Sequence, residues 1–398
     1  MVSQSKPLML GKKPKPQVIV KDRISQLPES KLWAFVPNID LDDEHEHFSE
    51  RNRDRNDYVH FAMFVDHVLS LHETDIHMFR LHCSIVEDFT PIEGWICSAI
   101  GRNAVEFDLH IESFRNKIFQ LPRSVFMHKK LVVLKLNSNC LSYVPPESGC
   151  FPSLKFLHVT VYFPNNALAE KLFSCCPVLE DLTIDGVVGY DALNFKISAP
   201  ELKMLRIRLR LGALGIDGNN FSVNAPKLET LDVTEVIFSN YNLESSKSIG
   251  CSLPAFGNLS ELKLVVRNRY HWELLTELLK RSPKLEHLVI EHEHELCCTT
   301  FSDDEEEVEE LSTVYLGPQW NTPETVPICV SSHLKTITIR GFGGGYDEME
   351  VAKYLLENGK VLNKMVIYSF VFSCGSEKLD KEIVMFQTGS RTCQVEFF

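Results

Sequence analysis

A short pattern of apolar positions recurs along most of the chain. The pattern is Leu-x-x-Leu-x-(Leu/Ile/Val), and clear copies are LVVLKL at Leu131 and LETLDV at Leu228. Its last two apolar positions are two residues apart, so their side chains share one face of a β-strand. The other copies begin at Ile76, Ala104, Leu154, Leu179, Leu202, Leu259, Leu285, Leu334 and Leu362.

The spacing of these copies predicts the fold class. Successive copies start 23–31 residues apart, apart from one interval of 49 residues. Leucine-rich repeats have periods of about 20–29 residues. A single strand cannot bury its apolar face alone, whereas stacked parallel copies form a continuous core. We therefore predict an α/β leucine-rich-repeat solenoid, with parallel strands on its concave face and helices and loops outside. The alternative is an α/β sheet of another topology.

Three of the segments between copies have helical patterns. They cover residues 166–177, 271–283 and 347–360. In the second segment the leucines form one stripe at helical spacing, and Pro283 predicts the end of that helix. The copy at Leu131 also carries Asn139, at a position where many repeats place an asparagine that binds backbone. Other copies lack it, which predicts an irregular stack.

The 49-residue interval contains an insertion. Residues 297–325 include seven acidic side chains between Asp303 and Glu310. Such a run repels itself and is typical of a solvated loop. The alternative is a docking site for a basic partner.

Composition and charge narrow the function. The 398-residue chain has a formal net charge of -13, which disfavours binding to nucleic acid or to an anionic membrane. No apolar run approaches the ~18 residues of a membrane span, and the amino-terminal segment lacks the pattern of a secretory signal. We expect a cytoplasmic or nuclear protein, in which the 12 cysteines are free thiols.

The sequence contains no strong pattern of a metal-binding, phosphate-binding or catalytic site. The segment HEHELCC contains His292, His294, Cys297 and Cys298, which are metal-ligand types, but its spacing is not that of a paired zinc site. A solvated strand end beside the acidic loop is the better interpretation. The GFGGGYDE segment lacks the spacing of a phosphate-binding loop and predicts a flexible connection, with Asp347 capping the next helix. We predict no catalytic residues, no cofactor and no metal, so that the protein is not an enzyme.

Binding is expected on the exposed positions that alternate with the buried pair in each strand. Charges of both signs alternate there, which favours a protein partner over a phosphate backbone. The candidate partner contacts are Lys135, Asn137, His158, Asp181, Asp185, Arg206, Arg208, Asp232 and Lys263.

Several segments resemble one known family. KDRISQLPE at residues 21–29 resembles the start of a plant F-box, and KLWAFVPNIDLDD at 31–43 resembles the segment that follows it. SCCPVLEDLTI and RSPKLEHLVI resemble the family's repeat phrase. The carboxyl-terminal stretch from VPICVSS to CQVEF resembles an FBD domain. The chain is thus similar to plant F-box/FBD/leucine-rich-repeat proteins from residue 22 to residue 398.

The resemblance implies a link to ubiquitin transfer. In that family the helical F-box binds the adaptor subunit of a cullin ubiquitin ligase, and the repeats present a substrate. Here SKLW follows Glu29 directly, so about 30 residues of helix are missing, if three helices of average length are lost. A remnant this short cannot form a core. The F-box positions that remain are Asp22, Arg23, Ile24, Leu27 and Pro28.

These observations predict a domain organisation. Residues 1–20 form a disordered basic tail, and 21–30 the truncated F-box. Residues 31–317 form an irregular repeat array with an acidic loop at 297–317, and 318–398 form an FBD-like cap. The predicted function is a protein-binding module like the substrate-recognition subunit of an SCF-type ligase, with weakened adaptor coupling. The alternatives are a stand-alone scaffold or decoy and a ligand-sensing repeat protein.

Overall fold

The structure is a computed structural model in which most repeats are described. The described residues are 35–43, 55–84, 86, 88–113, 119–139, 141–142, 150–162, 176–188, 194–211, 220–234, 254–266, 272–292, 320–369, 383 and 385–398.

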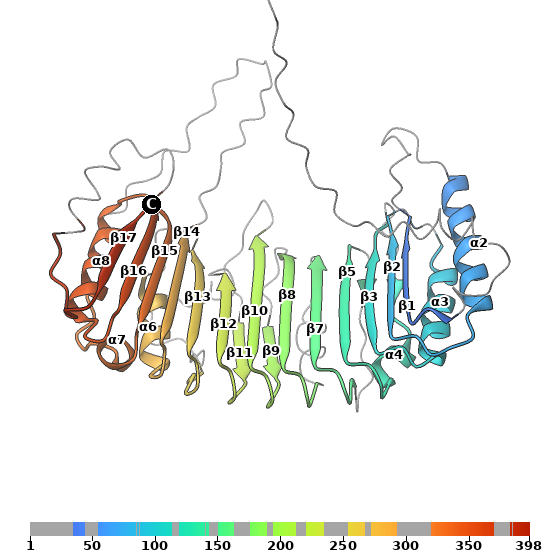
Figure 1. The fold of residues 1–398 in the computed structure, drawn as a ribbon, viewed down its shortest axis with the longest axis horizontal. Coiled ribbons are helices and arrows are strands. Elements are labelled where there is room, and N and C mark those ends of the chain that lie inside the picture. The colour runs from blue at the N-terminus through green and yellow to red at the C-terminus, as the bar shows by residue number, and fades with distance from the viewer. Residues whose placement is uncertain are drawn as a thin grey trace, which may run out of the picture.

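One long parallel sheet organises the described chain. Its 13 strands lie side by side in chain order, from β1 beside the amino-terminal helices to β17 at the other end (Figure 1). Every neighbouring pair is parallel, as expected when each strand returns through a crossover on the same side. The strands are β1 (Asn38–Asp42), β2 (Met78–Cys83), β3 (Glu106–Ile111), β5 (Val133–Ser138), β7 (Phe156–Tyr162), β8 (Asp181–Val188), β10 (Met204–Leu211), β12 (Thr230–Thr234), β13 (Glu261–Val266), β14 (His287–His292), β15 (Thr336–Phe342), β16 (Lys364–Ser369) and β17 (Gln394–Phe397).

The apolar pattern accounts for eleven of these strands. Each begins two residues after the first apolar residue of its copy, as β5 does after Leu131 and β12 after Leu228. The first residue of a copy is buried in the turn before the strand, and the next two apolar residues point into the core. The prediction of parallel stacked repeats is therefore confirmed. β1 and β17 extend the sheet beyond the copies that the pattern identified.

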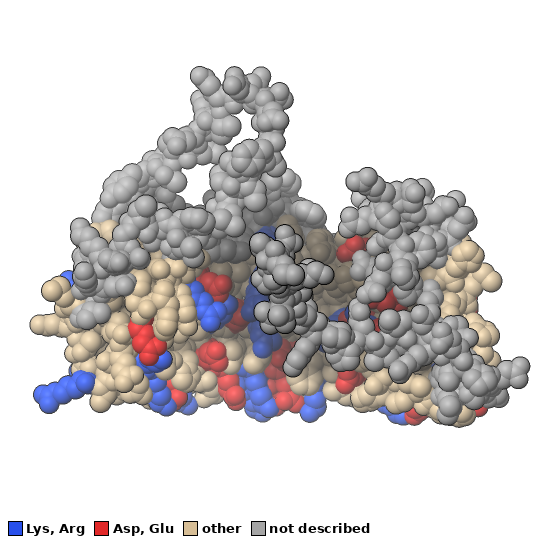
Figure 2. All heavy atoms as spheres, turned by 45° about the horizontal axis from the view of Figure 1, so that its top comes forward, with Lys and Arg blue, Asp and Glu red and all other residues tan. Residues whose placement is uncertain are grey.

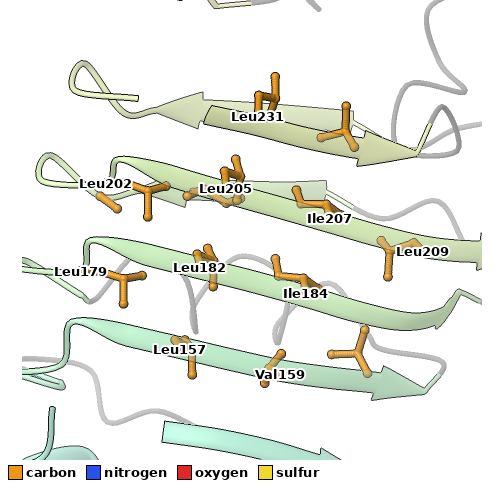
Figure 3. Close-up of a cluster of buried hydrophobic side chains, with 14 of the residues drawn as sticks. Leu157, Val159, Leu179, Leu182, Ile184, Leu202, Leu205, Ile207, Leu209 and Leu231 are labelled. Carbon is orange, nitrogen blue, oxygen red and sulfur yellow. The ribbon is translucent and has the colours of Figure 1, made fainter. Parts of the chain in front are cut away.

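The core is built from ladders of equivalent side chains. Leu182, Leu205 and Leu231 occupy matching positions on neighbouring strands and are completely buried. Figure 3 shows these leucines aligned across the strands, with Ile184 and Ile207 in the next ladder. Burying one such side chain contributes about 1.5–3 kcal/mol. Each rung completes the burial of its neighbours, which is why the stack is stable where a single repeat is not.

Helices and short strands pack against the core-facing side of the sheet. Helices gather at the two ends of the row (Figure 1). In the middle, the parallel strands β9 and β11 pack Ile197 and Val223 into the same core. The expectation of only helices and loops outside the main sheet was therefore wrong for this region. These elements are α2 (Arg55–Leu71), α3 (Thr90–Gly101), α4 (Arg123–Met127), α6 (Trp272–Arg281), α7 (Ile328–Ser332) and α8 (Tyr346–Asn358), with β4 (Phe119–Gln120), β6 (Leu141–Ser142), β9 (Asn194–Ser198) and β11 (Asn220–Asn224).

Two of the three predicted helices are confirmed. The segment 271–283 contains α6, and 347–360 lies largely within α8. The segment 166–177 lies almost wholly outside the described residues, as do the acidic run and the F-box positions Asp22 to Pro28. Within the described ranges, no helix is long and apolar enough to cross a membrane.

Asn139 has the role that its position predicts. Its side-chain oxygen accepts from the amide of Ser113 at 3.0 Å, and its amide group donates to the Ser113 carbonyl at 3.2 Å. This pair of bonds ties the turn after β5 to the turn after β3, so neighbouring repeats are joined through backbone groups that the strands leave unpaired.

Candidate protein-binding face

The outward-facing residues of the sheet form three rows, which together we call the open face. The amino-terminal row contains the first residue of each strand, and the middle and carboxyl rows contain the third and fifth residues. All nine predicted contacts lie in these rows, as alternation requires. Asp181 lies in the amino-terminal row. Asn137, Asp185 and Arg208 lie in the carboxyl row, and the middle row holds Lys135, His158, Arg206, Asp232 and Lys263.

Strand pairing brings most of the predicted residues into two groups. Lys135 and His158 are direct neighbours across β5 and β7. Arg206, Asp232 and Lys263 are consecutive across β10, β12 and β13. Thr183 separates the two groups in the middle row. Residues more than 100 positions apart in sequence therefore form one continuous surface.

Ion pairs connect charged side chains of the open face. His158 Nε2 lies 2.8 Å from Asp185 Oδ2, and Lys263 Nζ lies 2.5 Å from Glu291 Oε2. Lys135 Nζ lies 3.7 Å from Asp108 Oδ2. Each pair joins adjacent strands, so the charged side chains are held in place before a partner arrives. Because these side chains are already ordered, binding a partner would cost less conformational entropy.

Another short ion pair lies at the centre of the face. Arg208 Nη2 lies 2.5 Å from Asp232 Oδ2, and the hydrogen bond to Asp232 raises the pKa of Arg208. The Asp232 side chain is only 8 % exposed, whereas that of Arg208 is 51 % exposed. Asp232 Oδ1 is buried and accepts no hydrogen bond from a described residue. Removing Arg208 would consequently leave a buried carboxylate without its cation.

A second charged ladder follows the turns before the strands. Glu180 lies between Lys155 and Lys203, with both Nζ atoms 2.9 Å from its carboxylate. The hydrogen bonds from Lys155 and Lys203 lower the pKa of Glu180 to about 2. These groups are exposed, so solvent screens the interaction and its contribution to stability is small. The ladder marks the rim of the open face.

Sequence reasoning missed three residues of this face. Arg210 continues the column of Arg206 and Arg208 along β10, is exposed, and forms no ion pair with a described residue. His82 and His110 pair across β2 and β3. Both histidines follow the last apolar position of their copies, so aligning FRLHC with EFDLHI would have found them.

The rings of the two histidines contact each other at a tilt near the amino-terminal end of the sheet. Their ring centroids are 4.1 Å apart. His82 Nδ1 lies 3.1 Å from Asp42 Oδ1, and His110 Nε2 lies 3.0 Å from Glu112 Oε1. Each imidazole thus has a neighbouring carboxylate.

The HEHELCC segment has a structural role at its first histidine. His292 Nδ1 lies 2.6 Å from Glu348 Oε1, and both side chains are 11 % exposed. His294, Cys297 and Cys298 lie outside the described residues. In the part of the chain that the structure describes, no group of three or more His, Cys, Asp or Glu side chains could hold a metal ion.

Glu348 also replaces the predicted helix cap. Gly345 is the N-cap of α8, and its amide donates to the Glu348 carboxylate at 2.8 Å. Asp347 instead accepts from the backbone amide of Trp320 at 3.1 Å. The expectation that Asp347 caps the helix was therefore wrong, because the N-cap is Gly345, two residues earlier, in a capping box with Glu348.

The surface presents both signs of charge. Figure 2 shows Lys and Arg side chains beside Asp and Glu side chains across the middle of the molecule, without a broad patch of one sign. A mixed surface of ordered charges can match a protein partner group by group, which confers specificity. It is poorly matched to a uniform array of phosphates.

The fold and this face define a class, a parallel repeat solenoid with a charged outer surface. Comparison with known proteins identifies two matching family profiles. The FBD family profile matches residues 322–367, and the profile "FBD-associated F-box protein At5g56370, LRR repeats" matches residues 92–252. The chain is similar to plant F-box/FBD/leucine-rich-repeat proteins over most of its length, which confirms the resemblance seen in the sequence.

Relatives extend over nearly the whole chain. FBD-associated F-box protein At3g50710 of Arabidopsis thaliana is 29% identical, with 92% of this chain and 91% of the relative covered. FBD-associated F-box protein At5g56380 of the same plant is 27% identical over 92% and 91%. F-box/LRR-repeat protein At5g41840 is 32% identical over 46% of this chain and 38% of its own length. No solved structure matches the chain.

Proposed function

We propose that this protein binds a protein partner through the open face and acts as a recognition module rather than an enzyme. The single observation that carries this proposal is the continuous, mixed-charge surface that strand pairing builds from Lys135 to Lys263. The names of the relatives support a role among F-box proteins, whose repeats would present a substrate to an SCF-type cullin ubiquitin ligase.

The organisation of the chain supports separate roles for the repeat array and the carboxyl-terminal segment. The repeat array over 31–317 would hold the partner, and the segment 318–398 would close the carboxyl-terminal end of the stack. β15 pairs with β14 and continues the same core, so the FBD segment serves as a cap joined to the repeats. A cap is needed because the last repeat would otherwise expose its apolar ladder.

The truncated F-box favours a second candidate, a scaffold or decoy without a ligase link. The direct junction between Glu29 and Ser30 leaves no room for the helices that would contact the adaptor. Partner binding and ubiquitin transfer would then be uncoupled, and the bound protein would be held rather than degraded.

An adaptor pull-down tests the coupling. We expect the purified chain to retain no adaptor subunit above a blank resin, because a nine- or ten-residue remnant has no core to present a binding surface. The matched control is a chimera in which the complete F-box of At5g56380 replaces residues 21–30. Retention by the chimera alone supports uncoupling. Equal retention by the unaltered chain would refute it.

Substitutions on β10 test the binding face. We expect Arg206→Ala combined with Arg210→Ala to weaken partner capture from plant extract about tenfold or more, since arginines near the centre of an interface carry much of its energy. This pair avoids Arg208, whose removal would strand the buried Asp232 carboxylate. The readout is the co-purified proteins, quantified by mass spectrometry.

The control for this test is Lys360→Ala, which removes an exposed charge in the turn after α8, away from the open face. It should capture the same proteins as the unaltered chain. If the β10 double variant also captures them in full, the partner binds elsewhere.

A further inference from the structure

The middle row of the open face loses its charged side chains near the carboxyl-terminal end of the sheet. From β1 to β13 the middle row is charged or carries His158 at every strand except β8. On β14, β15 and β16 the same row reads Val289, Thr338 and Val366. These three side chains are adjacent and partly exposed. A neutral strip of branched side chains therefore replaces the charged residues of the middle row on β14 to β16, and the row ends with Glu396 on β17.

An aromatic stack lies beside this strip. Tyr368 follows on β16, is 41% exposed, and stacks on Phe398, which is 63% exposed, with ring centroids 5.4 Å apart. Arg340 is the direct neighbour of Tyr368 across β15 and β16. Its Cζ lies 5.9 Å from the Tyr368 ring centroid, at the outer limit of a cation–π contact. We call these six residues the C-terminal patch: Val289, Thr338, Val366, Arg340, Tyr368 and Phe398.

Arg340 has a carboxylate as its direct neighbour on β14, Glu291, but that carboxylate contacts Lys263. Across β16 and β17, Lys364 Nζ lies 2.8 Å from Glu396. Arg340 is exposed and forms no ion pair with any residue that the structure describes. Because Arg340 is exposed, its guanidinium N–H groups can reach a partner, and they match the two oxygens of a carboxylate.

A β-bulge after Arg340 positions this residue opposite Tyr368. The register between β15 and β16 shifts after Arg340, so that Phe342 rather than Gly341 opposes Ser369. Gly341 has φ +69, and a Cβ there would lie 2.4 Å from the His292 carbonyl oxygen. The bulge lets Arg340 stay opposite Tyr368 while Phe342 turns into the core.

We propose that the C-terminal patch binds an extended segment of a protein partner in which an acidic residue stands next to an aromatic or branched apolar residue. The carboxylate pairs with Arg340, and the apolar side chain lies on Val289, Thr338 and Val366 beside the Tyr368 ring. This inference rests on the proposed function and names the chemistry of one part of the partner. Complementarity to the unpaired Arg340 is what selects an acidic segment over a neutral or basic one.

A peptide selection tests the proposal. The full chain, tagged at its amino end so that Phe398 is unchanged, is the target for a random phage-displayed peptide library. The Arg340→Gln, Tyr368→Ala variant serves as counter-target. We expect the retained peptides to share an acidic residue within one or two positions of an aromatic or branched residue. A consensus without an acid, or peptides that bind both targets equally, would overturn the proposal.

A double-mutant cycle then isolates the contact. With one selected peptide in fluorescence anisotropy, Arg340→Gln should weaken binding about tenfold. Replacing the peptide's acid by its amide should weaken binding to the unaltered chain by a similar factor and to Arg340→Gln by little. Additive losses would show that the two groups do not meet.

Control variants distinguish failure of this proposal from failure of the proposed function and from misfolding. Lys360→Gln removes a charge elsewhere in the carboxyl-terminal repeats and should leave the affinity unchanged. The Arg206→Ala, Arg210→Ala variant should also bind the peptide normally, so failure at β10 and failure at the patch are distinguishable. Equal thermal unfolding midpoints confirm folding of each variant. Dimerisation that Tyr368→Ala abolishes would assign the patch to a second copy and refute the peptide proposal.

Discussion

Replacing Gly186 by alanine is expected to cost about 3–5 kcal/mol of the free energy of unfolding, or to prevent folding. Gly186 lies within β8 with φ +138, a conformation that side chains rarely adopt. A Cβ built there would lie 1.9 Å from the Val161 carbonyl oxygen on β7. The obstacle is backbone on a paired strand, so the chain cannot relax without breaking the β7–β8 pairing in the middle of the core.

Chemical denaturation followed by far-ultraviolet circular dichroism measures this loss. The matched control is Gly94→Ala in α3, where a Cβ would meet nothing within 4 Å. That substitution should be stabilising by about 0.5–1 kcal/mol, since alanine favours a helix and restricts the unfolded chain. If Gly186→Ala unfolds at the same denaturant concentration as the unaltered chain, the backbone geometry inferred for β8 is wrong.

Removing the Glu348 carboxylate is expected to cost about 3 kcal/mol, because it breaks a buried ion pair and a helix cap together. The carboxylate accepts from His292 Nδ1 at 2.6 Å, from the Gly345 amide at 2.8 Å and from the Gly343 amide at 3.1 Å. Glu348→Ala leaves His292 buried without this partner. The adjacent ring of Trp272, 5.3 Å from the His292 ring between centroids, would also lose its fixed neighbour.

The control for this site is Glu350→Ala, in the same helix, which forms no ion pair with a described residue. Its effect should stay within about 0.5 kcal/mol. Both variants are compared with the unaltered chain by denaturant unfolding at pH 7. Equal losses for the two variants would mean that the His292–Glu348 contact is not stabilising.

The same contact predicts a dependence on pH. Burial raises the pKa of Glu348, but hydrogen bonds and charge from His292, with the Gly345 and Gly343 amides, outweigh this and hold the pKa below its ordinary value. A lowered folded-state pKa gives stability that is fully present above the unfolded value of about 4.3 and is lost as pH falls through the folded value. The stability difference between the unaltered chain and Glu348→Gln should therefore shrink below about pH 4. A difference that is constant from pH 7 to pH 3 would contradict this assignment.

The strands of the sheet could be predicted because their apolar positions repeat. Leu182 and Ile184 face inward by alternation alone, and this fixes the opposite direction for Asp181, Thr183 and Asp185. The end strands β1 and β17 were harder to predict, since each has a neighbour on one side only and needs a weaker apolar signal. The short strands β9 and β11 have a pattern of their own, NFKIS and NFSVN 26 residues apart, which the pattern of the main strands did not identify.

Contacts between individual side chains could be predicted less well than the strands. His292 was grouped in sequence with His294, Cys297 and Cys298, yet its contact is Glu348, 56 residues later. That pairing exists because the end of β14 and the first turn of α8 meet in the folded stack. Likewise, the one-residue shift from Asp347 to Glu348 as the capping side chain depends on the turn at Gly345, which the acidic pair alone cannot specify.

By itself, the sequence determined that this is a stack of parallel repeats, where eleven of its strands lie, and which of their side chains face outward, because a buried apolar ladder allows only one phase of each strand. Tertiary structure alone decided which outward side chains become neighbours. Val289, Thr338 and Val366 are separated by 49 and 28 residues in the chain but by single strand spacings of about 4.8 Å in the sheet. Connections of different length return each strand to the same register, so lateral contacts, and the surface they create, do not follow from distance along the sequence.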